Sequence, residues 1–233
     1  MNIKKLFKIH YSYFMNKVNI IIIIICFLLI QAISIFSWKQ NLKLNLNEIM
    51  IIENSLTSIF TFLKLILVFF CIFMIGNFCL TERDEYKLFY VYNDVKSIKF
   101  YFTKLLSIDF LLLVFVILLY FVFMLIGMLF SNMFQFNFEY VKIFICLYLI
   151  GVIYGHLTII MMKVLNSSLT IFVSFIIFLS VDLIGDSKMI NTFFPTFELN
   201  LMSVYNLNYF ISLFIIMFFY FIISLILLSG KNS

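Results

Sequence analysis

Six long apolar stretches run along the chain, and short polar segments separate them. Each stretch comes close to the roughly 20 apolar residues that a helix needs to cross the hydrocarbon core of a bilayer, because each helical residue advances about 1.5 Å. A helix also bonds its own backbone polar groups, as a bilayer requires. The pattern therefore predicts six transmembrane helices, at Val18–Ser37, Ser58–Leu80, Ile108–Phe130, Tyr140–Met162, Ser168–Ile184 and Leu207–Leu228.

Little sequence remains outside these stretches. The chain has 233 residues, of which 65% are hydrophobic and only 12% are charged. The segments between the apolar stretches are too short to build a separate soluble core. We therefore expect one transmembrane domain over residues 1–233, with an all-α integral membrane fold.

Residues 1–17 show the spacing of an amphipathic helix. The apolar residues recur every three or four positions and so share one helical face: Ile3, Leu6, Phe7, His10, Tyr11, Phe14 and Val18. Lysines and small polar residues occupy the other face: Lys4, Lys5, Lys8, Ser12 and Asn16. We expect an interfacial helix with its lysines toward lipid phosphates. A positive flank that only fixes the topology remains the alternative.

Residues 81–104 are the most hydrophilic segment, and they connect the second and third predicted spans. The segment begins with the charged run Glu82, Arg83, Asp84 and Glu85. Further on, apolar residues at helical spacing, such as Leu88, Val91, Val95, Ile98 and Phe102, alternate with Lys87, Lys96, Lys99 and Lys104. This pattern predicts a short amphipathic helix followed by a lysine anchor at the third span. A loop in water or on the lipid surface is the alternative.

Lysine and arginine are distributed unequally between the two predicted sides. With the amino terminus in the cytoplasm, eleven fall on that side: Lys4, Lys5, Lys8, Lys17, Arg83, Lys87, Lys96, Lys99, Lys104, Lys163 and Lys231. Four fall outside: Lys39, Lys43, Lys142 and Lys188. Because basic residues are retained on the cytoplasmic side, this bias predicts cytoplasmic termini. The net charge of +5 then reflects topology and contact with anionic lipid, and we expect no nucleic-acid partner.

A few polar residues and glycines interrupt the predicted spans. Lys64 lies within the second span, where its long side chain can reach toward the interface or can pair with Asp182 or Asp186 near the outer end of the fifth. In the second case the pair would line a substrate route or lock an outer gate. Gly151 and Gly155 form a G-x-x-x-G motif, which typically allows two helices to pack closely.

Candidate chemistry for an enzyme is sparse. The two histidines, His10 and His156, belong to a surface helix and to a span, while the acidic run of residues 82–85 lies in water, so they do not form a metal site. The cysteines, Cys26, Cys71, Cys79 and Cys146, lie in predicted spans without the short paired spacing of a zinc or redox motif. We therefore expect no metal, no cofactor and no catalytic residue on this chain, although an integral membrane enzyme remains a minor alternative.

Together, these features resemble the membrane subunit of a type-2 ABC transporter. Such permeases have an amino-terminal interfacial helix, six spans, a cytoplasmic coupling helix between spans two and three, and a broken outer element before span six. Here Glu82, the stretch Tyr86–Lys99 and Lys104 stand where the family carries a glutamate, the coupling helix and a basic residue. Pro195 stands in the segment before the last span. The chain lacks the glycine-threonine pair usual after the glutamate, and Asn93 and Asp94 replace the usual proline.

The resemblance implies a function and partners. It implies an exporter in the bacterial cytoplasmic membrane, built from two permease chains, alike or paralogous, and two separate ABC ATPases that bind ATP and Mg²⁺. The chain has no phosphate-binding motif of its own, since Gly230 and Lys231 lack the rest of G-x-x-x-x-G-K-[ST]. The implied ATPase-coupling residues are Glu82, Arg83, Tyr86, Lys87, Val91, Val95, Lys99 and Lys104.

The expected cargo is an amphipathic or hydrophobic peptide, such as a toxin or an antimicrobial peptide. Small permeases of this kind often export such peptides for self-protection, and a lipid or a drug would also suit an apolar bundle. The competing function is that of a membrane immunity protein, which would bind a toxin without any ATPase.

Overall fold

The chain forms a bundle of α-helices. The computed structural model describes residues 3–15, 17–44, 47–80, 97–131, 134, 138–165, 169–184, 194–195 and 207–229. Within these residues there are seven helices and no strand. The helices are α1 (Ile3–Phe14), α2 (Lys17–Leu42), α3 (Glu48–Leu80), α5 (Ser97–Phe130), α6 (Phe138–Leu165), α7 (Thr170–Ile184) and α9 (Leu207–Ser229).

Five of the described helices are long and apolar enough to cross a membrane: α2, α3, α5, α6 and α9. The predicted all-α class is therefore confirmed, and the five apolar helices agree with the predicted multi-pass membrane protein. The fifth predicted span corresponds to α7, which has only 15 residues and so extends about 22 Å. This length falls short of a hydrocarbon core of about 30 Å. Five of the six predicted spans therefore correspond to helices of sufficient length, and α7 is too short to cross the core by itself as a straight helix.

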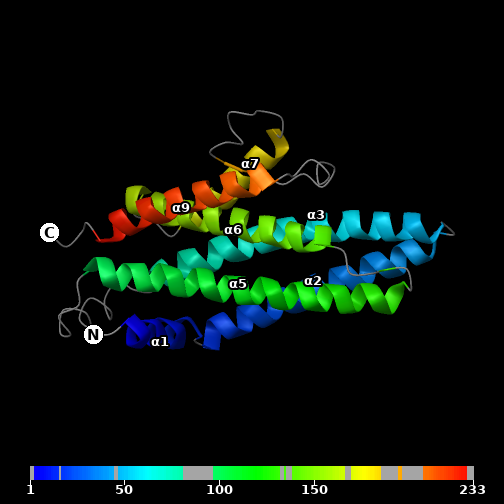
Figure 1. Ribbon diagram of the computed structural model, residues 1–233, viewed down its shortest axis with the longest axis horizontal. Coiled ribbons are helices and arrows are strands. Elements are labelled where there is room, and N and C mark those ends of the chain that lie inside the picture. Colours follow the sequence, from blue (N-terminus) through cyan, green and yellow to red (C-terminus); the bar gives the residue numbers. More distant parts are fainter. Residues whose placement is uncertain are drawn as a thin grey trace.

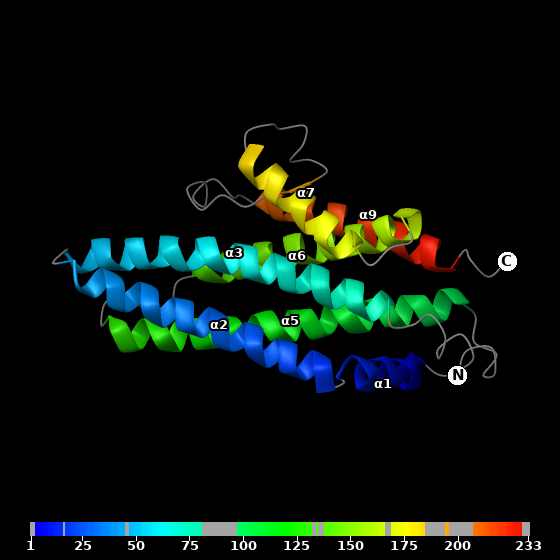
Figure 2. The ribbon, with the colours of Figure 1, turned by 180° about the vertical axis from the view of Figure 1, so that it is seen from behind.

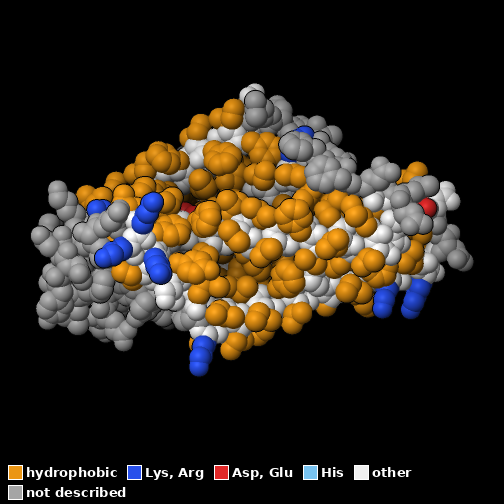
Figure 3. All heavy atoms as spheres, turned by 60° about the horizontal axis from the view of Figure 1, so that its bottom comes forward, with side chains coloured by type: hydrophobic (Ala, Val, Ile, Leu, Met, Phe, Trp, Pro, Cys, Tyr) orange, Lys and Arg blue, Asp and Glu red, His pale blue; other side chains and the backbone are white. Residues whose placement is uncertain are grey.

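The four long helices α2, α3, α5 and α6 run along one axis and alternate in direction along the chain (Figure 1). The start of α1 and the end of α9 lie at the same end of this bundle, which we call the N/C end; the opposite end is the far end. Figure 2 shows α7 rising away from the bundle while α9 returns toward the N/C end. Apolar side chains cover the middle of the face in Figure 3, and lysines gather toward both ends.

Helix α6 is the centre of the bundle and packs against α3, α9, α7 and α5. Its two motif glycines face α3: a Cβ at Gly151 would lie 2.7 Å from Cys71 Sγ, and one at Gly155 would overlap the Ile75 side chain. Residue numbers increase in the same direction on both helices, from Gly151 and Cys71 to Gly155 and Ile75, so α3 and α6 are parallel neighbours. The predicted role of these glycines in close helix packing agrees with this geometry.

Polar contacts at two levels fix α2 against α3. Near the far end Asn41 Nδ2 donates to Ser55 Oγ at 3.1 Å, and near the N/C end Asn77 Nδ2 lies 3.3 Å from Asn19 Oδ1. The two contacts are 22 residues apart on each helix, or about 33 Å at 1.5 Å per residue. This distance is close to the thickness of the hydrocarbon core. We call these contacts the far clamp and the N/C clamp.

The amino-terminal helix is present, and its buried face is narrower than predicted. Leu6, His10 and Phe14 are at most 2% exposed, whereas Ile3 and Tyr11 are 50% and 43% exposed. The buried residues lie four apart, and α1 packs with them against α5. The buried face is narrow because one neighbouring helix covers only one stripe of α1.

The predicted coupling helix and the outer segment around Pro195 fall mostly outside the described residues.

Candidate functional site: two ionisable pairs inside the bundle

Ionisable side chains within membrane helices are costly, and those that occur usually have a partner and a function. The described residues contain two contacts of this kind. Lys64 of α3 pairs with Asp182 of α7, and Asp109 of α5 pairs with His156 of α6. Each contact joins two helices that are far apart in the chain. The two pairs are therefore the strongest candidates for a functional site.

The Lys64–Asp182 pair has the geometry of a strong ion pair. Lys64 Nζ lies 2.6 Å from Asp182 Oδ1, and the two side chains are 15% and 19% exposed. Asp182 is two residues before the end of α7. Because the carboxyl end of a helix carries a partial negative charge, the Lys64 ammonium is attracted both by the carboxylate and by the helix terminus. The pair therefore holds the tip of α7 against α3.

The clamps show how deep this pair lies. Lys64 is nine residues from Ser55, so it lies about 13.5 Å from the far clamp. Helix α7 runs antiparallel to α3, since Ile171 faces Gly76 near the N/C clamp and Asp182 meets Lys64. Ile184, the last residue of α7, is then roughly 10 Å short of the far clamp. The ion pair thus lies near the middle of the region between the two clamps, at the carboxyl end of α7.

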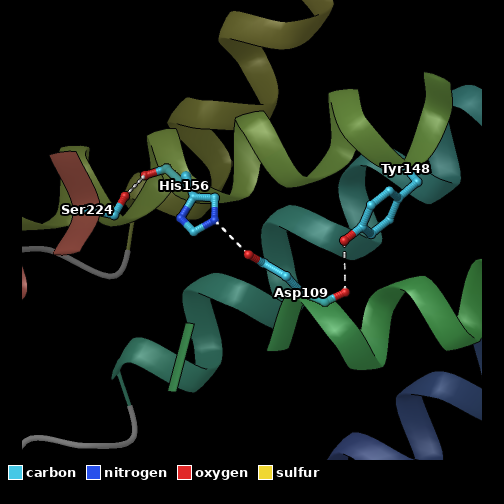
Figure 4. Close-up of polar contacts among 4 residues, drawn as sticks. All are labelled: Asp109, Tyr148, His156 and Ser224. Carbon is cyan, nitrogen blue, oxygen red and sulfur yellow. Dashed lines mark hydrogen bonds and ion pairs between the residues drawn. The ribbon is translucent and has the colours of Figure 1, made fainter. Parts of the chain in front are cut away.

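The Asp109–His156 pair lies at the junction of three helices (Figure 4). His156 Nε2 is 3.2 Å from Asp109 Oδ2. The Tyr148 hydroxyl of α6 donates to the Asp109 backbone oxygen at 3.0 Å, and the Ser224 hydroxyl of α9 donates to the His156 backbone oxygen at 3.3 Å. Phe221 of α9 packs edge-on against the imidazole, with ring centroids 5.5 Å apart. Helices α5, α6 and α9 therefore meet around one buried imidazole.

This second pair lies at the level of the N/C clamp. Gly155 packs on Ile75, so the following residue, His156, is level with Gly76 and Asn77 of the N/C clamp. His156 is completely buried, whereas the Asp109 side chain is 14% exposed. The carboxylate is therefore the member of the pair that solvent or lipid reaches first.

A third polar group lies where α1 meets α5. His10 is fully buried, and its ring packs edge-on against Phe100 at 4.8 Å between centroids. Burial lowers the pKa of His10 from 6.5 to about 3; the Lys104 ammonium acts in the same direction, and a backbone hydrogen bond with Phe100 acts against it. Lys104 is also fully buried, 5.9 Å from the centre of the Tyr101 ring. His10 is therefore neutral at physiological pH.

The structure brings some of the predicted site residues together and leaves others undescribed. Lys64 meets Asp182 as one of two expected partners, while Asp186 lies outside the described residues. Lys104 is buried beneath α1 and contributes to the α1–α5 junction, and Lys99 is partly exposed. The other predicted coupling residues lie outside the described part of the chain: Glu82, Arg83, Tyr86, Lys87, Val91 and Val95.

The sequence analysis did not single out Asp109, and it placed His156 in a span without a partner. In the structure, His156 Nε2 contacts the Asp109 carboxylate. A signal was present, because Asp109 is the one acidic residue between Ile108 and Phe130, the bounds of the third predicted span. An isolated acid in a span indicates a partner on another helix.

No family model, curated protein or solved structure matches this chain.

Proposed function

We propose that this chain is the transmembrane subunit of an ATP-driven exporter that resembles the type-2 ABC permeases. It would lie in the bacterial cytoplasmic membrane with the N/C end in the cytoplasm. Helix α7, with the segment after it, would form the fifth of six membrane segments. The exposed lysines of α1, Lys4, Lys5 and Lys8, support this orientation, because basic residues and anionic lipids favour the cytoplasmic face.

The observation that carries the proposal is the bracing of α5 by α1. In the sequence, the hydrophilic residues 81–96 connect α3 to α5, and α5 packs against α1. Leu6 and Phe100 pack together there, each at most 1% exposed. Helix α5 is 34 residues long, or about 51 Å. A force applied to the hydrophilic connection would therefore move α5 as a rigid rod together with α1, along the length of the bundle.

In this proposal the force comes from a separate ABC ATPase that grips the stretch Tyr86–Lys99. Two permease chains and two ATPases would form the working unit. Closure of the ATPases around ATP would rock the bundle between inward and outward access, a rigid-body change of the kind seen in many switching proteins. The cargo would be an amphipathic peptide that enters from the bilayer, since the bundle surface is apolar over its middle (Figure 3).

The Lys64–Asp182 pair would serve as the outer gate of this exporter. It ties the tip of α7 to α3 near mid-membrane depth. Separation of the pair would release α7 and open a route beyond it. Because each charge is costly without its partner at this depth, the gate would favour the closed state until cargo or the ATPase cycle moves α7.

A cross-linking experiment tests the ATPase partnership. A cysteine placed at Val91 or Val95 should form a cross-link with an ABC ATPase co-expressed from the same gene neighbourhood. The matched control is a cysteine at Lys43, which is exposed at the far end and should give no cross-link. Absence of any cross-link in an assembled, ATP-hydrolysing complex would overturn the proposed coupling.

A transport experiment tests the gate. Replacing Lys64 with methionine should reduce export of peptide from cells at unchanged expression, whereas Lys43→Met at the far surface should have no effect. Equal export by wild type and Lys64→Met would remove the gate from the proposal. Protection against a toxin that survives deletion of the partner ATPase would instead identify a membrane immunity protein.

A further inference from the structure

We propose that the seam between α7 and helices α6 and α9 binds a cationic side chain of an amphipathic peptide, and that Lys64 holds the place of this cation while the seam is closed. Lys64 Nζ lies 2.6 Å from Asp182 Oδ1, so an ammonium group already occupies the position. A lysine or arginine of a peptide would pair with the same carboxylate. This inference rests on the proposed exporter and its gate, and it names the charge of the cargo and the event that opens the gate.

One face of α7 supplies half of this seam. Ser174, Phe178 and Asp182 follow one another at intervals of four residues and therefore share a helical face. Ser174 and Phe178 are fully buried, and the Phe178 ring packs edge-on against Tyr154 of α6 with ring centroids 5.1 Å apart. Tyr154 also interacts electrostatically with Asp182 and with Tyr220 of α9. The seam thus combines a carboxylate, a serine hydroxyl, two phenols and a phenylalanine ring.

Two hydroxyl groups in the seam lack a hydrogen-bond partner. Among the described residues, nothing bonds to Tyr154 Oη or Ser174 Oγ, although both atoms are buried. Other helical hydroxyls of this chain bond the carbonyl four residues earlier, as Thr158 does in α6 at 2.8 Å and Ser34 in α2 at 2.9 Å. Buried polar groups without partners are unusual and call for an explanation. A ligand with N–H donors would satisfy both hydroxyl oxygens when α7 moves and admits it.

The charges in the seam favour a cation over an anion. Asp182 lies two residues before the carboxyl end of α7, so its carboxylate and the partial negative charge of the helix end act in the same direction. Hydroxyl oxygens and the faces of aromatic rings also attract ammonium and guanidinium groups. Lys64 has a long, flexible side chain, so its ammonium group can withdraw while α3 stays in place. A peptide cation can therefore replace the ammonium group of Lys64.

Exchange of one cation for another would couple cargo binding to the gate. When a peptide cation pairs with Asp182, Lys64 no longer ties α7 to α3, and α7 is free to move. The apolar side chains of the peptide would meanwhile contact the rings of Phe178 and Tyr154, which are buried in the closed seam. Return of Lys64 to the carboxylate would displace the peptide. Lys64 would then act first as a competitor of the cargo and afterwards as the group that expels it.

A binding measurement with a defined probe tests this exchange. The probe is a fluorescent amphipathic peptide made of leucine and lysine, and the comparison peptide carries glutamine at each lysine position. Fluorescence anisotropy would be recorded with the chain in phosphatidylcholine nanodiscs, without ATPase or nucleotide, and the signal of empty nanodiscs would be subtracted. The lysine peptide should bind at least about tenfold more tightly than the glutamine peptide, since hydrogen bonds between charged groups are roughly twice as strong as neutral ones.

Variants of the seam should change this affinity in opposite directions. Lys64→Met should bind the lysine peptide at least about tenfold more tightly, because the competing cation is gone and the buried carboxylate is left unpaired. Asp182→Asn should bind it at least about tenfold more weakly, and Tyr154→Phe roughly three- to tenfold more weakly through the loss of one hydrogen bond. The matched control is Glu53→Gln, which removes an exposed carboxylate from α3 and should leave the affinity unchanged.

The gain for Lys64→Met is the decisive result, because a misfolded chain or a purely structural ion pair would not produce it. A Lys64→Met chain that binds the lysine peptide no more tightly than wild type would overturn the proposal. So would equal binding of the two peptides, or tighter binding of an analogue with glutamate in place of lysine. Since the assay contains no ATPase, its failure leaves the cross-linking result for the exporter untouched, and failure of the cross-link leaves the peptide site untouched.

Discussion

Acidification should release α1 from α5, because the docked helix buries His10 in its neutral form. His10 is fully buried in the described structure, and its pKa is lowered from 6.5 to about 3. When α1 leaves α5, the imidazole returns to an aqueous interface, where its pKa should be close to the ordinary value of about 6.5. Between these two values the undocked state binds more protons than the docked state. Docking is therefore strongest above about pH 6.5 and weakens as the pH falls toward about 3.

The size of the effect follows from the pKa difference. Each pH unit below 6.5 weakens docking by about 1.4 kcal/mol until the lower pKa is approached. At pH 5 the loss is about 2 kcal/mol, so the ratio of undocked to docked helix should rise roughly 30-fold. At pH 4 the same reasoning gives roughly 300-fold. These changes are large enough to detect even if few molecules are undocked at neutral pH.

A distance measurement between α1 and α5 would report this change. Nitroxide labels can be attached at Ser12→Cys and Ile98→Cys, two exposed positions, after the native cysteines have been replaced. Double electron–electron resonance in nanodiscs should give one narrow distance distribution at pH 7.5 and an added broad component at pH 5 and below. His10→Phe keeps a ring against Phe100 and cannot be protonated, so its distribution should stay narrow. A wild-type distribution that is the same at pH 7.5 and pH 4 would refute the reasoning.

Three further changes test the packing and the polar contacts of the bundle. Gly155→Val should lower thermal stability by about 1–3 kcal/mol, because the added methyl groups overlap Ile75 on α3, and an unchanged unfolding midpoint in detergent would contradict the close packing. Lys64→Met should cost about 2 kcal/mol by leaving the Asp182 carboxylate unpaired; combining Lys64→Asp with Asp182→Lys should restore part of the loss in a thermal-shift assay, and no recovery would argue against a direct pair. Asn41→Leu removes the hydrogen bonds to Ser37 and Ser55 and should cost about 1 kcal/mol by the same assay, whereas a gain in stability would exclude the far clamp.

The apolar pattern was sufficient to predict most of the fold. Runs of about 20 apolar residues predict spans by length alone, and five of the six predicted ranges coincide with helices long enough to cross. The real helices extend beyond the apolar runs, as α3 does by starting at Glu48 where Ser58 was expected. Hydropathy locates the part of a helix in contact with lipid, whereas backbone hydrogen bonds continue into water. The predicted end of the fifth span, Ile184, is also the last residue of α7, but hydropathy alone did not show that this 15-residue helix is too short to cross the core.

The candidate site was only partly predictable, because its contacts depend on which helices are neighbours. Lys64 and Asp182 could be paired from sequence since opposite charges in spans rarely remain alone. The Asp109–His156 contact requires α5 to lie beside α6 at one particular level, and this level is fixed by Gly155 against Ile75 and by the clamps. Helical spacing gives the face on which a residue lies. It does not give the relative height of two helices.

The two ionisable pairs share one mechanical feature. Lys64 belongs to α3 and His156 to α6, and these two helices are held together by the glycine contacts at Gly151 and Gly155. Their partners, Asp182 and Asp109, belong to α7 and α5, which lie on different sides of this unit (Figure 2). Separation of either pair therefore moves an outer helix against the same α3–α6 core. In the proposed exporter, a force on α5 would therefore act on the Asp109–His156 contact, while release of α7 from Lys64 would be a separate step.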